Sequence, residues 1–116
     1  MKRDPLIWGT ISSEARNYKM FSEHNELVPD IASQEIVTRS LTALRAFFTE
    51  EGLLTKSIKD SNNQLIDMEL RASDFTSEGL SLVRSKVSSW VDSKGAKKSP
   101  PDMTTLKNAL EKIRSK

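Results

Sequence analysis

The sequence contains no cysteine, so it has no disulfide framework, thiolate metal site or cysteine nucleophile. Its single histidine, His24, lies in a polar segment with no second imidazole, which is typical of a solvated side chain. Four isolated glycines cannot form a glycine-rich phosphate loop, and the sequence carries no metalloprotease, nucleophile-elbow or Walker motif. We therefore expect a non-enzymatic protein with no catalytic residue, cofactor or metal ion.

Long hydrophobic runs are also lacking. No apolar stretch approaches the roughly 18 residues of a membrane-spanning helix, and Leu6–Trp8 is too short for the core of a signal peptide. With 36% hydrophobic and 29% charged residues, a chain of 116 residues fits one domain with a modest core. These features predict a single domain over residues 1–116 in a cytoplasmic protein of bacterial or phage type.

The net charge of +2 is unevenly distributed. Residues 1–51 carry six Lys/Arg against eight Asp/Glu, whereas residues 94–116 carry seven basic groups against two acidic ones. A basic C-terminal segment can contact phosphate or an acidic partner, although a solvated terminal helix accounts for it equally simply.

The first half of the chain shows helical periodicity in two places. Ile11, Ala15, Tyr18 and Phe21 predict a helix over about 12–24, after a short helical turn starting at Asp4-Pro5. A stronger stripe predicts a helix over 33–51, which is capped by Asp30 or Ser33 and ended by Gly52. Glu50 and Glu51 lie at the negative end of its dipole, where cations are preferred.

The second half begins with a predicted hairpin, with strands 53–59 and 65–71 around a turn at 60–63. Thr76 caps a predicted helix over 77–94. A Gly/Pro linker over 95–101 then leads to a basic helix over 102–114. The predicted fold class is α+β, mainly α, in the order helix–helix–β-hairpin–helix–helix.

Two short motifs frame this hairpin, Gly52-Leu53-Leu54 before it and Thr76-Ser77-Glu78-Gly79 after it. Together they make residues 52–80 resemble the wing of MarR-type winged-helix regulators. The resemblance implies a winged-helix-like fold, with the helix ending at Glu51 as the DNA-recognition helix and the helices after Thr76 as an oligomerisation surface. The DNA-contacting candidates under this interpretation are Thr38, Arg39, Thr42, Arg45, Lys56 and Lys59.

Binding to a protein partner is the favoured interpretation, because the basic excess lies outside the predicted reading helix. Several amphipathic helices on a small domain can leave one apolar stripe uncovered for a partner helix or a homodimer. The protein-binding candidates are Trp90, Val91, Leu106 and Leu110, or the acidic helix end at Glu50 and Glu51. The predicted function is thus an interaction module of the adaptor, inhibitor or immunity type, with a DNA-binding transcriptional regulator as the alternative.

Overall fold

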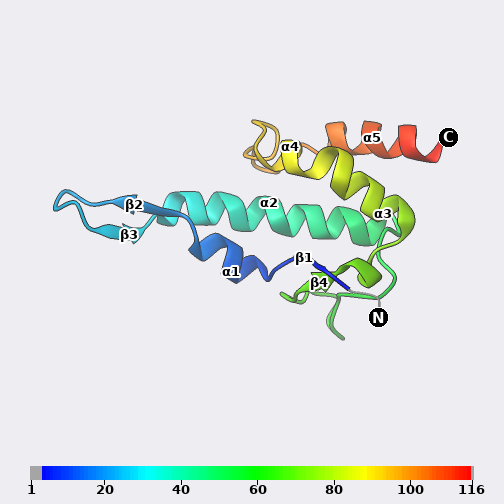
Figure 1. The fold of residues 1–116 in the computed structure, drawn as a ribbon, viewed down its shortest axis with the longest axis horizontal. Helices are drawn as coiled ribbons and strands as arrows, with labels where there is room; N and C mark the ends of the chain where they lie inside the picture. Colours follow the sequence, from blue (N-terminus) through cyan, green and yellow to red (C-terminus); the bar gives the residue numbers. More distant parts are fainter. Residues whose placement is uncertain (1–3, 116) are drawn as a thin grey trace.

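The computed structural model describes residues 4–115, and a 20-residue helix, α2 (Ile31–Glu50), runs through the middle of the molecule (Figure 1). Asp30 begins it, because its carboxylate accepts hydrogen bonds from the backbone N–H and the hydroxyl of Ser33. Gly52 ends it with φ of +69°, a left-handed conformation that glycine adopts without strain. The predicted central helix and both of its end signals are confirmed.

The predicted helix over 12–24 is wrong beyond residue 16. A short helix, α1 (Ile11–Arg16), packs against α2, and the chain then forms two antiparallel strands, β2 (Lys19–Phe21) and β3 (Leu27–Pro29). Ile11 and Ala15 are buried, whereas Tyr18 and Phe21 are exposed. The apolar residues at helical spacing therefore contribute to the core only as far as Ala15.

The predicted helical turn at Asp4-Pro5 is also wrong, since the segment that follows is a strand. β1 (Leu6–Trp8) pairs antiparallel with β4 (Leu70–Arg71). The Trp8 ring packs edge-on against Phe48 and Phe75, with ring centroids 4.9 Å from each. Trp8 therefore lies in the protein's own core with Ile7 packed against it, whereas Leu6 is 48% exposed.

The predicted hairpin over 53–71 is only partly present. The turn is there: the Asp60 N–H donates to the Gln64 carbonyl at 2.9 Å, and Lys59 forms an isolated bridge with Leu65. The flanking segments pair elsewhere, however, because Leu54 bridges to Phe75 and β4 pairs with β1. The fold is α+β and mainly helical, as predicted, whereas the winged-helix arrangement is not confirmed.

The second half forms an antiparallel helical pair (Figure 1). A 3-10 turn, η1 (Ala72–Asp74), precedes it, and one arm of the pair consists of α3 (Ser77–Leu82), a π-helical segment η2 (Val83–Val87) and α4 (Ser88–Val91). The other is α5 (Thr104–Arg114), which packs on α3 and η2. The Thr76 hydroxyl accepts from the Gly79 N–H at 3.1 Å, so the predicted cap is confirmed.

The segment predicted as a linker, residues 95–101, is a folded loop. Ala96 is fully buried, and the Gly95 carbonyl accepts from the Asp102 N–H at 2.9 Å. The Trp90 indole N–H donates to the Asp102 carbonyl at 2.9 Å, which ties the loop to α4.

One hydrophobic core joins β1, α1, α2 and the three helices of the second half. The molecule measures 53 × 34 × 33 Å, and Figure 1 shows that β2 and β3 extend its long dimension beyond the start of α2. No helix in residues 4–115 is long and apolar enough to cross a membrane.

Candidate functional site

The strands β2 and β3 form a projecting arm, residues 19–29. Lys19 lies opposite Pro29, Met20 opposite Val28, and Phe21 opposite Leu27. A tight turn closes the tip: the Ser22 N–H donates to the Glu26 carbonyl at 2.8 Å, and Asn25 takes a left-handed φ of 61°. Asparagine tolerates this conformation better than most residues.

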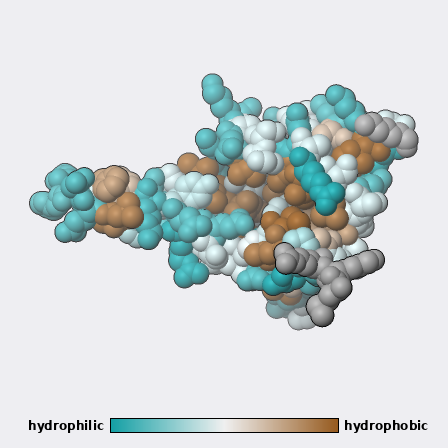
Figure 2. Space-filling view, in the orientation of Figure 1, coloured by the Kyte–Doolittle hydropathy of each residue, from teal (hydrophilic) through white to brown (hydrophobic). Residues whose placement is uncertain are grey.

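The arm exposes large apolar side chains that a folded monomer normally covers. Phe21 is 68% exposed, Leu27 59% and Met20 50%, and Tyr18 and Ile31 are exposed at its base. Figure 2 shows hydrophobic residues exposed on the projecting arm, between its polar tip and the body of the molecule. An exposed apolar patch with a polar rim is typical of an interaction site.

The base of the arm is held firmly to the helices. The Tyr18 carbonyl accepts from the Asp30 N–H at 3.0 Å and from the Gln34 side-chain amide at 3.1 Å. The Asp30 carboxylate also caps α2 by accepting hydrogen bonds from Ser33. The two bonds from Ser33 lower the pKa of the Asp30 carboxyl below its ordinary value. The arm is thus presented in a fixed direction from the start of α2.

Beside this base lies an open groove between α1 and α2, with a volume of about 560 Å³. Its floor is largely apolar, and arginine side chains lie among its lining residues, which are Ser12, Ala15, Arg16, Ile31, Gln34, Glu35, Thr38 and Arg39. We call this the α1–α2 groove.

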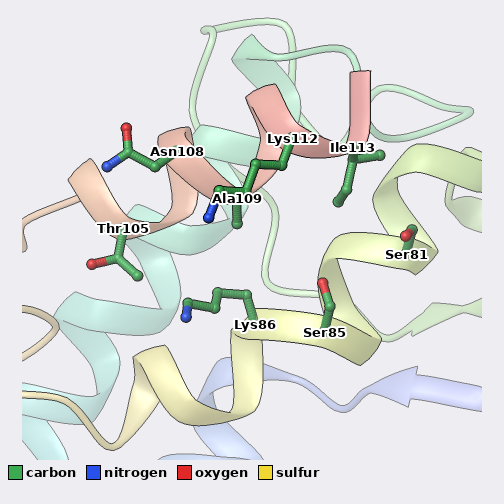
Figure 3. A pocket seen from close by; sticks show the side chains of 8 residues that line it. All are labelled: Ser81, Ser85, Lys86, Thr105, Asn108, Ala109, Lys112 and Ile113. Atoms are coloured by element: carbon green, nitrogen blue, oxygen red, sulfur yellow. The ribbon is translucent and has the colours of Figure 1, made fainter. Parts of the chain in front are cut away.

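A second hollow, of about 460 Å³, lies between α5 and the helix formed by α3 and η2 (Figure 3). Figure 3 shows Lys86 and Lys112 extending toward the same end of it from opposite walls. Ser81, Ser85, Thr105 and Asn108 supply further polar groups. The π-helical segment carries Ser85 and Lys86, and such segments often occur at functional sites.

Three of the residues predicted to contact a protein partner lie in the protein's own core. Trp90, Leu106 and Leu110 are buried, and only Val91 is partly accessible. Because α4 and α5 pack their apolar stripes inward, a partner has no access to these side chains in this fold. The packing of α5 on α3 and η2, and of all these helices on one core, accounts for the stripes.

The acidic helix end at Glu50 and Glu51 is neutralised by a residue far along the chain. Arg114 donates to the Glu51 carbonyl at 2.7 Å and to its carboxylate at 3.1 Å, and it also contacts Glu78 at 3.4 Å. Arg114 therefore supplies the cation that the negative end of the α2 dipole favours. Glu50 remains exposed.

Arg45, a predicted DNA contact, is a structural residue. It is 1% exposed, and its guanidinium donates to the Met68 carbonyl at 2.6 Å and to the Gly9 carbonyl. It also lies 5.6 Å from the centre of the Trp8 ring. Burial lowers the pKa of Arg45 from its usual range, while Glu14 and Asp67 act in the opposite direction.

The other predicted DNA contacts do not form one basic face. Arg39 donates to the Lys97 carbonyl at 2.9 Å, and Lys56 pairs with Asp74 at 3.1 Å. Thr38 and Thr42 are exposed, but their hydroxyls donate to carbonyls one turn earlier in α2. Lys59 lies in the 59–65 turn, where it bridges to Leu65.

Asp67 caps α1 from a distant part of the chain. Its carboxylate accepts from the N–H groups of Ile11 and Ser12, at 2.5 and 3.1 Å, and from the Ser12 hydroxyl at 2.5 Å. Partial burial acts to raise the pKa of Asp67, but these hydrogen bonds, with Arg45 nearby, outweigh it and the pKa is lowered. Within residues 4–115 no group of three or more His, Cys, Asp or Glu residues is arranged to hold a metal ion.

Comparison of the chain with protein-family models, with curated proteins and with solved structures finds no match in any of the three. The MarR-type resemblance of residues 52–80 therefore stays an interpretation of the motifs. Its two halves do meet in space: the Leu53 carbonyl accepts from the N–H and the hydroxyl of Thr76, at 2.9 and 3.2 Å.

The sequence did not predict the arm, because helical periodicity favoured a helix over the residues that form β2. A signal for it was present, since Ser22–Glu26 is a run of polar and turn-forming residues between two short apolar segments. The helical spacing of Ile11, Ala15, Tyr18 and Phe21 competed with this signal.

Proposed function

We propose that this protein is a non-enzymatic interaction module that binds a protein partner through the arm. The observation that carries the proposal is the exposure of Phe21, Leu27 and Met20 on a structured projection with a polar tip. Aromatic residues and methionine are enriched at protein interfaces, and apolar side chains that a partner covers form the core of such interfaces.

The physics of a two-stranded ribbon supports the same proposal. A hairpin with strands of three residues is marginal in water unless a further layer covers one of its faces. Phe21 and Leu27 are directly opposite each other and share one face, so a partner that covers this pair completes the missing layer.

Both strand edges oppose simple strand addition. Pro29 removes a backbone donor from β3, and Lys19 places a charge on β2. The partner therefore contacts the side chains of the arm rather than extending its backbone ladder.

The test is affinity capture with three purified proteins: wild type, a variant with Phe21→Ser and Leu27→Ser, and a control with Ile66→Ser. Ile66 is also an exposed apolar residue but lies outside the arm. We expect wild type and the control to retain the same partner and the arm variant to lose it, with circular dichroism showing all three folded. A partner retained by the folded arm variant contradicts the proposal.

The DNA-binding alternative makes the opposite prediction in the same set of proteins. Mobility-shift assays with duplex DNA at low salt would then show binding that falls as salt rises. Such binding, unchanged in the arm variant, supports the regulator interpretation and contradicts the arm proposal.

A further inference from the structure

Resting on the proposed function, we infer that the partner of the arm is a second copy of this chain. In the inferred complex the two copies exchange arms, and each arm lies in the α1–α2 groove of the other copy. This assigns an occupant both to the arm and to the groove at its base.

The arm and the groove match in length. From Lys19 to Glu23 the extended chain reaches about 15 Å, at about 3.3 Å per residue. The part of α2 that lines the groove, from Ile31 to Arg39, is about 12 Å long, at 1.5 Å per residue. The strand is thus about as long as the groove, and the tip of the arm reaches the far end of the groove.

The two surfaces also match in chemistry. Phe21 and Leu27 would meet the apolar floor that Ala15 and Ile31 provide. The tip carries Glu23 and Glu26, with His24 between them and no lysine or arginine from Ser22 to Glu26.

The charges of the groove complement this tip. Arg16 and Arg39 lie among its lining residues against a single carboxylate, Glu35. The only side-chain hydrogen bond of Arg16 within residues 4–115 goes to the Ser12 carbonyl of its own helix. Nε of Arg39 is buried and has no hydrogen-bond partner in the same range, and its Nη2 donates to the Lys97 carbonyl. The Arg16 guanidinium therefore retains donors for a carboxylate, and both arginines contribute positive charge to the groove.

The area available is sufficient for a specific dimer. Four exposed apolar side chains at the arm and its base (Tyr18, Phe21, Leu27 and Ile31) would each bury on the order of 100 Å². The symmetric pair would then bury about 800 Å² of apolar surface, and because about 60% of an interface is apolar, the total area exceeds the roughly 1,000 Å² that a specific interface requires. Since the arm starts beside the groove, a twofold axis near the arm bases would place each arm in the α1–α2 groove of the other copy.

The test uses sedimentation velocity on the full chain over a range of concentrations. Wild type is expected to form dimers and no larger species, because the twofold exchange is closed. Variant A carries Glu23→Lys and Glu26→Lys, and variant B carries Arg16→Glu. Each alone places like charges at the arm–groove contact, and we expect each to weaken the dimer at least about tenfold.

Mixing the two variants separates arm exchange from any other dimer. In the mixed pair the basic tip of A meets the acidic groove of B, while the acidic tip of B meets the arginines of A. We therefore expect a heterodimer as stable as the wild-type dimer. The control variant Ile66→Ser should dimerise like wild type.

Three results would overturn the inference. They are a wild-type chain that stays monomeric at about 100 μM, a dimer that A and B leave unchanged, and folded variants whose mixture fails to associate. A monomer that still captures another protein in a Phe21-dependent manner overturns only this inference and leaves the proposed function standing.

Discussion

At the scale of single residues, Arg45 links three segments of the chain. Its guanidinium joins α2 to the Gly9 carbonyl before α1 and to the Met68 carbonyl before β4, and it packs over Trp8. The sequence presented Arg45 as a basic residue on an exposed helix face. Its burial follows from contacts with residues 36 and 23 positions away, which no local pattern contains.

Replacement of Arg45 should therefore lower stability rather than nucleic-acid binding. We expect Arg45→Ala to cost about 2–4 kcal/mol in the free energy of unfolding, because two buried carbonyls lose their charged donor. Arg45→Lys should recover only part of this loss, since an ammonium cannot reproduce the planar fork. Urea unfolding beside the exposed control Arg84→Ala checks this, and an Arg45→Ala protein as stable as the control would contradict it.

Gly79 allows α3 to approach the end of α2 closely. A Cβ atom at this position would lie 2.5 Å from the Leu53 carbonyl oxygen, which is a backbone atom and cannot move aside alone. The same oxygen accepts both hydrogen bonds from Thr76. The motif that suggested a regulator wing thus has a packing role at this junction.

We expect Gly79→Ala to destabilise the protein by about 1–3 kcal/mol through this overlap, despite the better helix propensity of alanine. The matched control is Ser81→Ala, an exposed position of the same helix. Equal urea midpoints for the two variants would show that the close approach is not required.

Four aspartates, Asp4, Asp30, Asp67 and Asp102, have lowered pKa values because they accept hydrogen bonds from neighbouring hydroxyl and backbone N–H groups. Each has a lower pKa in the folded than in the unfolded chain. Its contribution is therefore complete above the unfolded value of about 3.9 and is lost as pH falls through the folded value.

The contribution of these four aspartates to the free energy of unfolding should therefore stay constant near neutral pH and decrease below about pH 4. Asp67→Asn should reduce stability at pH 7 by about 1 kcal/mol, because it removes the charge and one of the two acceptor oxygens at the start of α1, and it should flatten the acid dependence. Urea unfolding from pH 7 to pH 3 checks both statements. An Asp67→Asn protein with the wild-type acid profile would show that this carboxylate is not linked to folding.

At the scale of elements, the sequence predicted those whose signals are local. The helix α2 has its cap, stripe and glycine stop within a continuous segment, and α3 likewise begins at Thr76. The strand pair β1–β4 was not predictable this way, since Leu6 pairs with Arg71. Nor was the shortening of the predicted hairpin, because Leu54 bridges to Phe75 and β4 pairs with β1, while only residues next to the turn pair with each other.

The burial of the residues predicted to contact a partner also depends on packing between distant segments, which local signals do not show. An amphipathic stripe shows that a helix covers something, but it does not say whether the partner is another helix of the same chain. Trp90, Leu106 and Leu110 all pack in the core of their own chain. The arm was missed for the opposite reason, because its apolar residues match a helix but have nothing to cover them.

The arm should be dispensable for folding. Its strands lie outside the hydrophobic core, so replacing residues 20–28 with a short glycine–serine turn should change the free energy of unfolding by less than about 1 kcal/mol. The shortened protein should at the same time lose association. Urea unfolding and sedimentation on the same sample check the two parts, and an unfolded product would place the arm among the structural elements.

At the scale of the whole molecule, the acidic tip and exposed apolar side chains of the arm lie away from the basic C-terminal helix. The acidic-tipped arm projects at one end, while the basic C-terminal helix closes the body and Arg114 completes the end of α2. The core lies outside the arm, and the arm carries Phe21, which has the highest exposed fraction, 68%, of the large hydrophobic side chains in residues 4–115. The fold thus combines a self-sufficient body with one projecting contact element.

The most direct test of this account is photo-crosslinking with Phe21 replaced by a photoreactive phenylalanine analogue, beside a control with the same analogue in place of Ile66. The account predicts that crosslinks from position 21 join the arm to another protein chain and that position 66 gives none. The absence of crosslinks from position 21, or equal crosslinking from position 66, would contradict the claim that the arm is the binding element.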